Sequence, residues 1–250
     1  MSTTGSPTSG SDTPGSDTPG SDTPGSDTED LRWLRHNRID LALHRVAIGE
    51  DPSFRPLLLL HGLGERTPVS LPDSIRWPGP VFGLDFTGHG RSTLSVGGGY
   101  TSEILVGDVD AALEVLGQVT ILGRGVGAYI GLLIAAARPA QVVGVVLADG
   151  PGLVGGGVHP GSPSVAFPAP WATPTPDPFA LLELSRDVRP PDYAQTYVRF
   201  VIERSGLDKA LMVAAIARPE WLAAVAAEPG VGQAPVAEAL RFFAEHIDTA

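Results

Sequence analysis

The chain has 250 residues, of which 42% are hydrophobic and 18% are charged, so it can build the core of one large domain or two small ones. It carries 17 Lys and Arg against 28 Asp and Glu, a formal net charge of −11, which argues against a nucleic-acid-binding surface. It contains no cysteine, which excludes disulfides, zinc–thiolate sites, iron–sulfur clusters and cysteine nucleophiles.

The first 30 residues differ in composition from the rest. Ser-Asp-Thr-Pro-Gly occurs three times in succession over residues 11–25, and a truncated copy follows at 26–28. The segment holds six acidic residues and no Lys or Arg, which leaves 22 acidic and 17 basic residues for the remainder. Because it has almost no apolar surface to bury, it cannot offset the entropy cost of ordering. Residues 1–30 are predicted to be a disordered tail, and residues 31–250 a folded domain.

Neither a signal peptide nor a membrane span is expected from the sequence. The tail lacks a basic start and an apolar stretch, and the longest mostly apolar run without charge, Gly125 to Ala137, is too short to cross a bilayer. We therefore expect a cytoplasmic protein that does not bind membranes.

Short apolar runs alternate with longer amphipathic ones along the folded part. The first run, Arg38 to Ala47, alternates apolar and polar residues as a half-buried strand does. Continuous apolar runs then predict strands that are buried on both faces. These are Leu57–Leu60, Val81–Asp85, Val119–Leu122 and Val142–Ala148.

Two helices are predicted between these strands. One begins after an N-cap at Thr101 or Ser102, and the other, Val126 to Ala137, ends at Arg138-Pro139. Residues 154–178 are dense in Gly, Pro and Ser and predict an irregular segment. Later helices are predicted at Phe179–Ser185, Tyr193–Ser205, Pro219–Ala227 and Ala234–His246, whereas Leu211–Ala217 fits a strand or a helix.

This alternation predicts an α/β fold with a mostly parallel sheet flanked by helices. Ligands of such sheets bind beyond the carboxyl ends of the strands. Glycine-rich loops follow Leu60, Leu84, Leu122 and Ala148, and all four are expected at that edge.

Four stretches, in order and at matching spacing, resemble the α/β-hydrolase family. His61-Gly62-Leu63-Gly64 resembles its oxyanion loop, and Asp85-Phe-Thr-Gly-His89-Gly-Arg-Ser92 resembles the loop after the next strand. Residues 100–117 resemble the helix before the nucleophile strand, and Gly123-Arg124-Gly125-Val126-Gly127 resembles the nucleophile elbow. The resemblance covers residues 31–152 and implies the α/β-hydrolase fold, with residues 179–227 as cap-like helices.

The elbow departs from the family pattern at its central residue. The family motif is Gly-x-Ser-x-Gly, and Gly125 stands at the position of the serine. A hydrogen atom cannot be an acyl nucleophile, so serine-hydrolase chemistry is not expected. Glycine tolerates the positive φ of the elbow best, so loss of the serine relieves strain. Gly123 and Gly127 are expected to persist because strand and helix pack closely there.

The other triad members are equally hard to place. The family has an acid after a late strand and a histidine near the chain end. Asp149 is the possible acid, although a strand-end aspartate capping the Gly-Pro-Gly turn is the more ordinary interpretation. His246 lies on the closing helix, and the last strand is not recognisable. His61 and His89 are possible bases, although in the family both positions shape loops.

The resemblance also assigns an anion-stabilising site. The backbone N–H groups of Leu63 and Val126 match the oxyanion hole, with Gly62 beside them. Arg124, if it is not paired with an acid, can bind a carboxylate or phosphate. We expect a small-molecule ligand with a carbonyl or carboxylate, no cofactor, and no metal, because no His/Asp/Glu cluster has ligand spacing.

Three functions remain open from the sequence. The first is an α/β-hydrolase-fold protein that has lost its serine and binds a small molecule or a protein partner. The second is an active hydrolase of esters, amides or carbonyl compounds, or a lyase, that uses the oxyanion hole and a histidine base. The third is an interaction module whose cap-like helices carry Trp171 and Trp221 as anchors.

Overall fold

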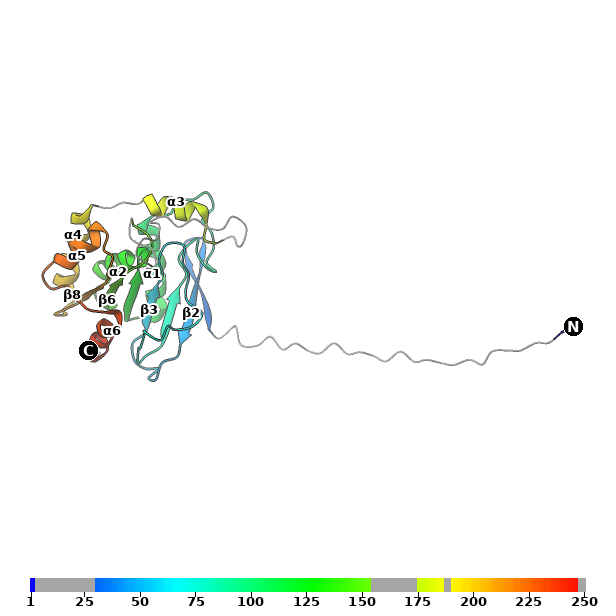
Figure 1. The fold of residues 1–250 in the computed structure, drawn as a ribbon, viewed down its shortest axis with the longest axis horizontal. Coiled ribbons are helices and arrows are strands. Elements are labelled where there is room, and N and C mark those ends of the chain that lie inside the picture. Colours follow the sequence, from blue (N-terminus) through cyan, green and yellow to red (C-terminus); the bar gives the residue numbers. More distant parts are fainter. Residues whose placement is uncertain (3–29, 154–174, 187–189, 247–250) are drawn as a thin grey trace.

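The computed structural model describes residues 1–2, 30–153, 175–186 and 190–246, and its centre is one eight-stranded sheet (Figure 1). The strands are β1 (Leu31–His36), β2 (Ile39–Ala47), β3 (Leu57–Leu60), β4 (Val81–Leu84), β5 (Val119–Arg124), β6 (Val142–Ala148), β7 (Leu211–Ala214) and β8 (Gly232–Gln233). The helices are α1 (Ser102–Leu116), α2 (Val126–Ala137), α3 (Pro178–Arg186), α4 (Pro191–Arg204), α5 (Glu220–Ala227) and α6 (Val236–His246).

The strand order is β1-β2-β4-β3-β5-β6-β7-β8. β1 pairs with β2, and β2 with β4, in antiparallel fashion, whereas every pair from β4 to β8 is parallel. The carboxyl ends of β3 to β8 therefore meet at one edge, as the alternating pattern predicts. The predicted α/β class with a mostly parallel sheet is confirmed.

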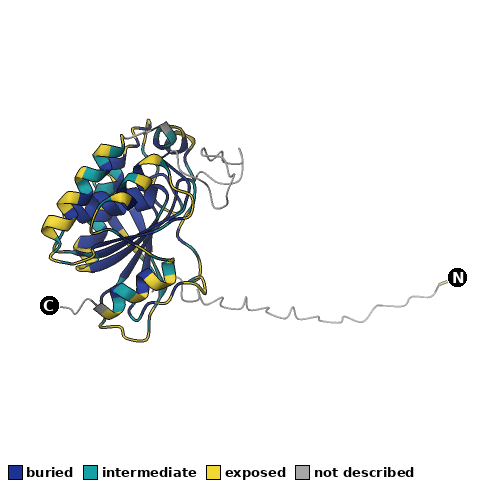
Figure 2. Ribbon diagram, turned by 60° about the vertical axis from the view of Figure 1, so that its left-hand side comes forward, coloured by how far each residue is buried: buried dark blue, intermediate teal, exposed yellow. Residues whose placement is uncertain are grey.

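Alternate residues of β3 show how helices cover both faces of the sheet. Leu58 and Leu60 belong to the larger apolar cluster, which contains buried residues of α1, α2, α4 and α5. Leu57 and Leu59 belong to the second cluster, with Leu240 and Phe243 of α6. This period of two is what a strand buried on both faces requires. Figure 2 shows the buried sheet between the two layers of helices.

The helices predicted between the strands begin where the sequence signals them. The Thr101 hydroxyl accepts a hydrogen bond from the Ile104 N–H, which makes Thr101 the N-cap of α1. α2 spans the predicted Val126 to Ala137 and is buried along almost its whole length, since it is apolar on every side. It ends at Arg138, before Pro139, which restricts the residue that precedes it.

Residues 179–227, which are expected to form cap-like helices, include α4 and α5. Both belong to the helical layer on the sheet, since α4 contacts α2 and α5, and α5 contacts β7. Trp221 of α5 is 4% exposed and its ring packs edge-on against Tyr129 at 5.1 Å, so it fills the core. Amphipathic helices bury their apolar face wherever one is available, and here that face is α2. Trp171 lies outside the described residues.

The structure contains two strands, β1 and β8, that the sequence does not predict. β1 was not predicted, because its exposed residues include Trp33 and two arginines and give no clear alternation. The last strand, expected to be missing, exists as the two-residue β8, which pairs with β7. Two residues are too few to produce a strand pattern. Leu211–Ala214, left open between strand and helix, is β7.

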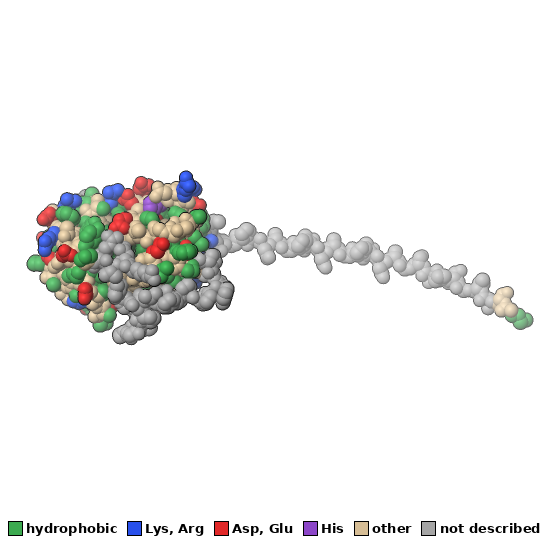
Figure 3. All heavy atoms as spheres, turned by 90° about the horizontal axis from the view of Figure 1, so that it is seen from above, with side chains coloured by type: hydrophobic (Ala, Val, Ile, Leu, Met, Phe, Trp, Pro, Cys, Tyr) green, Lys and Arg blue, Asp and Glu red, His purple; other side chains and the backbone are tan. Residues whose placement is uncertain are grey.

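The surface carries both signs of charge. Figure 3 shows acidic and basic side chains interspersed among hydrophobic ones on the visible face. Several are joined in ion pairs, such as Arg35 with Asp40 at 3.0 Å and Arg138 with Asp110 at 2.7 Å. Within the described part of the chain, no helix is long and apolar enough to cross a bilayer. The predicted tail at residues 1–30 lies, up to Glu29, almost wholly outside the described residues.

Candidate functional site

A tight turn joins β5 to α2 at the carboxyl edge of the sheet, and Gly125 is at its apex. Gly125 has φ 52° and ψ −117°, a conformation that costs glycine least, as the sequence predicts. A Cβ atom at Gly123 would lie 2.6 Å from the Cα of Ala128, and one at Gly127 would lie 2.6 Å from the carbonyl oxygen of His61. The flanking glycines are therefore required by the close packing of strand, helix and loop.

The strand order and this turn together decide the fold. A parallel sheet in the order above, preceded by two antiparallel strands, carries a glycine-flanked elbow between its central strand and the following helix. The chain has the α/β-hydrolase fold.

Comparisons with known proteins add little to this assignment. No family model matches the chain, and no curated protein matches it. Among solved structures it is similar to a putative lipase from Acinetobacter baumannii (22% identity, 48% of this chain and 42% of that chain, TM-score 0.40). It is also similar to an epoxide hydrolase from Vigna radiata (25%, 50% and 40%, TM-score 0.38) and a proline iminopeptidase from Mycobacterium smegmatis (19%, 49% and 45%, TM-score 0.40). The chain spans less than half the length of each of these structures.

In this α/β-hydrolase fold the expected oxyanion hole is filled by the chain itself. The backbone N–H groups of Leu63 and Val126 both donate to the carbonyl oxygen of Pro151, at 2.9 and 3.0 Å. Their convergence on one oxygen is the geometry that stabilises an oxyanion in the active members of such folds. Here the oxygen belongs to the loop after β6.

The same loop fills the space of a nucleophile side chain. A Cβ atom added to Gly125 would overlap the Pro151 carbonyl oxygen and lie 2.7 Å from that of Gly150. At Gly62, predicted to line the hole, an added Cβ atom would lie 2.5 Å from the Pro151 ring. Glycine at both positions is therefore a condition for the close approach of this loop.

The loops that follow β7 and β8 carry neither an acid nor a histidine. Residues 215–219, between β7 and α5, contain no acid or histidine, and neither do Ala234 and Pro235, between β8 and α6. Asp149, the predicted acid, accepts hydrogen bonds from the N–H groups of Ile216 and Ala217, at 2.6 and 2.8 Å. It thus caps the turn after β7. The side chain of His246 lies outside the described residues.

His61, a predicted base, is held in the interior. Its Nδ1 donates to the Gly62 carbonyl at 2.8 Å, and its Nε2 accepts from the Phe86 N–H at 3.1 Å. Burial lowers the pKa of His61, so the ring is neutral, and both of its nitrogens are engaged. It holds the loops after β3 and β4 together.

His89, the other predicted base, is fully buried 5.1 Å from the His61 ring. Its Nδ1 donates to the Thr87 carbonyl at 3.1 Å, and its Nε2 has no hydrogen-bond partner among the described residues. Burial, and the neighbouring His61, lower the pKa of His89 to about 3. A base must reach its substrate's proton, and a side chain with no exposed surface does not.

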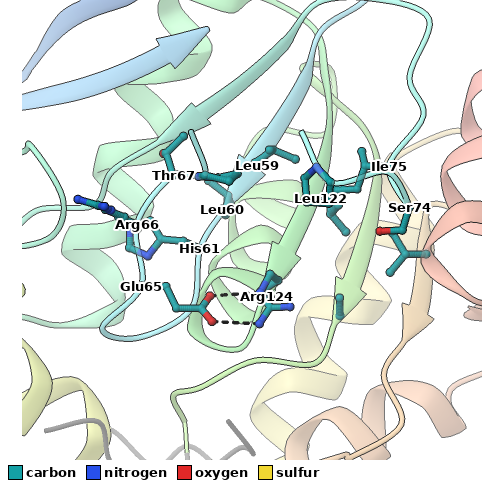
Figure 4. Close-up of a pocket in the computed structure, with 14 residues that line it drawn as sticks. Leu59, Leu60, His61, Glu65, Arg66, Thr67, Ser74, Ile75, Leu122 and Arg124 are labelled. Atoms are coloured by element: carbon teal, nitrogen blue, oxygen red, sulfur yellow. Dashed lines mark hydrogen bonds and ion pairs between the residues drawn. The ribbon is translucent and has the colours of Figure 1, made fainter. Parts of the chain in front are cut away.

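Arg124 is paired with an acid that the sequence analysis did not single out. Its Nε and Nη2 donate to the two carboxylate oxygens of Glu65, at 3.2 and 3.0 Å (Figure 4). Glu65 also accepts from the Gly62 N–H. Burial alone would raise the pKa of Glu65, but the Arg124 guanidinium outweighs burial and lowers it. The remaining nitrogen of Arg124, Nη1, has no partner within the described ranges.

Beside this ion pair lies a cavity of about 540 Å³, at the carboxyl ends of β3, β5 and β6. Its wall is mostly apolar and includes Leu59, Leu122 and Ile75 (Figure 4). Its charged lining residues are Glu65, Arg66 and Arg124. Its size is that of an ordinary small-molecule site. Gly125 and Pro151 do not line it. In the part of the chain that the structure describes, no cluster of His, Asp and Glu could hold a metal ion.

Neither the cavity nor the filled oxyanion hole could be inferred from the motifs alone. Gly150-Pro151-Gly152 offers one signal, because glycines on both sides of a residue allow its backbone to approach another closely. The role of Glu65 depends on the distance between two loops, which no local pattern encodes.

Proposed function

We propose that this α/β-hydrolase-fold protein binds a small molecule and does not hydrolyse it. The observation that carries the proposal is the Pro151 carbonyl oxygen, which accepts from both predicted oxyanion-hole amides. A substrate carbonyl needs those two donors, and a nucleophile needs the volume beside Gly125 that the same loop fills.

The alternative, an active hydrolase or lyase that works with a histidine base, has less support. It requires an accessible base near an open oxyanion hole. Both nitrogens of His61 already form hydrogen bonds, and His89 has no exposed surface. The loop that carries Pro151 would also have to move, so that its carbonyl leaves the Leu63 and Val126 amides before each turnover.

The ligand in this proposal occupies the cavity beside the Glu65–Arg124 pair. An apolar wall favours an apolar ligand body, and burying it supplies most of the binding free energy. The free Nη1 of Arg124 is a donor for one acceptor group, and its charge favours a carboxylate. We infer a ligand with an aliphatic or aromatic body and one terminal carboxylate, the class that the sequence analysis expects.

The proposal predicts binding of straight-chain carboxylates from hexanoate to dodecanoate. The affinity should rise with chain length until the cavity is full, because each buried CH₂ contributes about 0.8 kcal/mol. Isothermal titration calorimetry, with thermal shift as a second readout, measures this series. A flat response across the series would contradict the proposed site.

Two variants locate the ligand. Leu122→Trp fills the cavity from β5, and Arg124→Ala removes one of the two arginines that line the cavity and leaves Glu65 without its ion-pair partner. Each is expected to weaken binding at least tenfold, about 1.4 kcal/mol. Arg241→Ala on α6 is the matched control, since Arg241 is exposed and does not line this cavity. Equal losses in all three variants would place the ligand elsewhere.

A further inference from the structure

A second cavity, of about 400 Å³, lies on the other side of residues 66–68, which line both cavities. β2 contributes His44 and Arg45 to it, the segment after β3 contributes Arg66, and the loop after β4 contributes Arg91. Arg91 belongs to the Asp85–Ser92 motif, and the other three residues carry no motif assignment. Three arginines from three separate segments thus surround one cavity in a chain that has 17 basic residues in all.

Two of these arginines have no charge partner among the described residues. The side chains of Arg66 and Arg91 form no ion pair or side-chain hydrogen bond with any residue that the structure describes. In Figure 4 the side chain of Arg66 extends away from the Glu65–Arg124 pair. Arg45 is paired with Asp30 at 2.9 Å, at the rim of the cavity.

The Asp85 carboxylate, which also lines the cavity, already accepts three hydrogen bonds. Asp85 is 1% exposed and accepts from the Thr67 N–H at 2.8 Å, the Arg91 N–H at 2.9 Å and the His44 Nε2 at 2.9 Å. Its charge is therefore met by three donors, and it does not take up either free guanidinium. Because Arg66 and Arg91 both line the cavity, its lining residues carry an excess of positive charge.

Two further polar groups lack partners at this place. Thr67 lines the cavity, but its hydroxyl oxygen is buried beside Gly83 of β4 and forms no hydrogen bond within the described ranges. The His44 ring donates to Asp85 through Nε2, so its Nδ1, which has no partner in the same part of the chain, is an acceptor in the neutral ring and does not itself favour an anion.

We propose that this second cavity binds a phosphate group, held between Arg66 and Arg91. Two exposed guanidinium groups from different loops can both donate to a tetrahedral dianion with oxygens in several directions, whereas a planar carboxylate is satisfied by one fork. Arg45 lies within the same cavity and exchanges part of its contact with Asp30 for the ligand. The inference does not depend on the proposed function, because Leu122 and Arg124 do not line this cavity.

Inorganic phosphate and pyrophosphate are the probes, titrated into the full chain by calorimetry at low and at physiological ionic strength. Arg91→Ala is expected to weaken pyrophosphate binding at least tenfold, and Arg66→Ala together with Arg91→Ala to remove it. Arg241→Ala is the control and should bind as the native chain does. Leu122→Trp should also bind phosphate normally, which separates failure here from failure of the carboxylate site.

Three outcomes would overturn the proposal. The first is no heat of binding for either probe at low ionic strength. The second is equal weakening by Arg91→Ala and Arg241→Ala, which would indicate attraction by overall charge only. The third is binding of acetate as tight as that of phosphate, which would show that the site does not select a dianion.

Discussion

Replacing Gly125 with serine is expected to lower the free energy of unfolding by roughly 2 to 4 kcal/mol. Two effects add. The φ of 52° and ψ of −117° strain any residue with a Cβ atom, and that atom would overlap the carbonyl oxygen of Pro151. The loop at Gly150 must move, and the Leu63 and Val126 amides then lose their acceptor. Denaturant unfolding followed by circular dichroism measures the change.

Gly117→Ser is a closely matched control. Gly117 has φ 72° and ψ −129°, nearly the conformation of Gly125, and nothing lies within 4 Å of its added Cβ atom. This variant therefore has the backbone strain without the overlap, and it should lose only about 1 kcal/mol. Equal losses in the two variants would show that the loop after β6 does not fill the elbow in solution.

Asp85→Asn is expected to destabilise the fold by roughly 3 kcal/mol. The buried carboxylate accepts from Thr67, Arg91 and His44, so it holds the loops after β3 and β4 on β2. An asparagine of the same shape supplies only one oxygen and points an N–H₂ group at a donor. Asp73→Asn is the control, because Asp73 is exposed and forms no hydrogen bond with the described residues, and it should change stability very little.

Asp85 should also make the stability of the fold depend on pH. Burial alone would raise the pKa of Asp85, but the His44 and backbone hydrogen bonds outweigh burial and lower it from 3.8 to about 2. A carboxyl whose pKa is lower in the folded state stabilises that state above its unfolded pKa. Native stability should thus fall by about 2 kcal/mol through Asp85 between pH 4 and pH 2. Asp85→Asn should lose less over this window, and equal pH profiles of the two proteins would contradict the assignment.

Local patterns predict most of the sheet and its helices. Leu57–Leu60 is apolar at every position because it is buried on both faces, and Val126–Ala137 is an apolar helix that ends before Pro139. The backbone conformation of Gly125 is predictable for the same reason, since a glycine between Gly123 and Gly127 after a buried strand indicates a turn with positive φ. These features depend on neighbours along the chain.

The contacts that shape the site depend on residues far apart in sequence. The sequence leaves Asp149 as a possible acid, or more ordinarily as a cap on the Gly-Pro-Gly turn. Its carboxylate in fact caps the N–H groups of Ile216 and Ala217, which lie 67 and 68 residues away in sequence. The bond from Leu63 to Pro151 and the pair of Glu65 with Arg124 likewise join separate loops at the sheet edge. Sequence periodicity carries no information about such distances. The two amides could therefore be predicted from the sequence, but the Pro151 carbonyl that accepts from both could not.

The most direct test of the central claim is hydrolysis of p-nitrophenyl esters, from acetate to octanoate, by the native chain. Because the Pro151 carbonyl accepts from the two amides that are expected to form an oxyanion hole, and Gly125 offers no nucleophile, release of p-nitrophenol should equal that of the heat-denatured protein at every chain length. Saturable turnover above that level, removed by His89→Ala or His61→Ala, would contradict the account and identify a hydrolase with a histidine base.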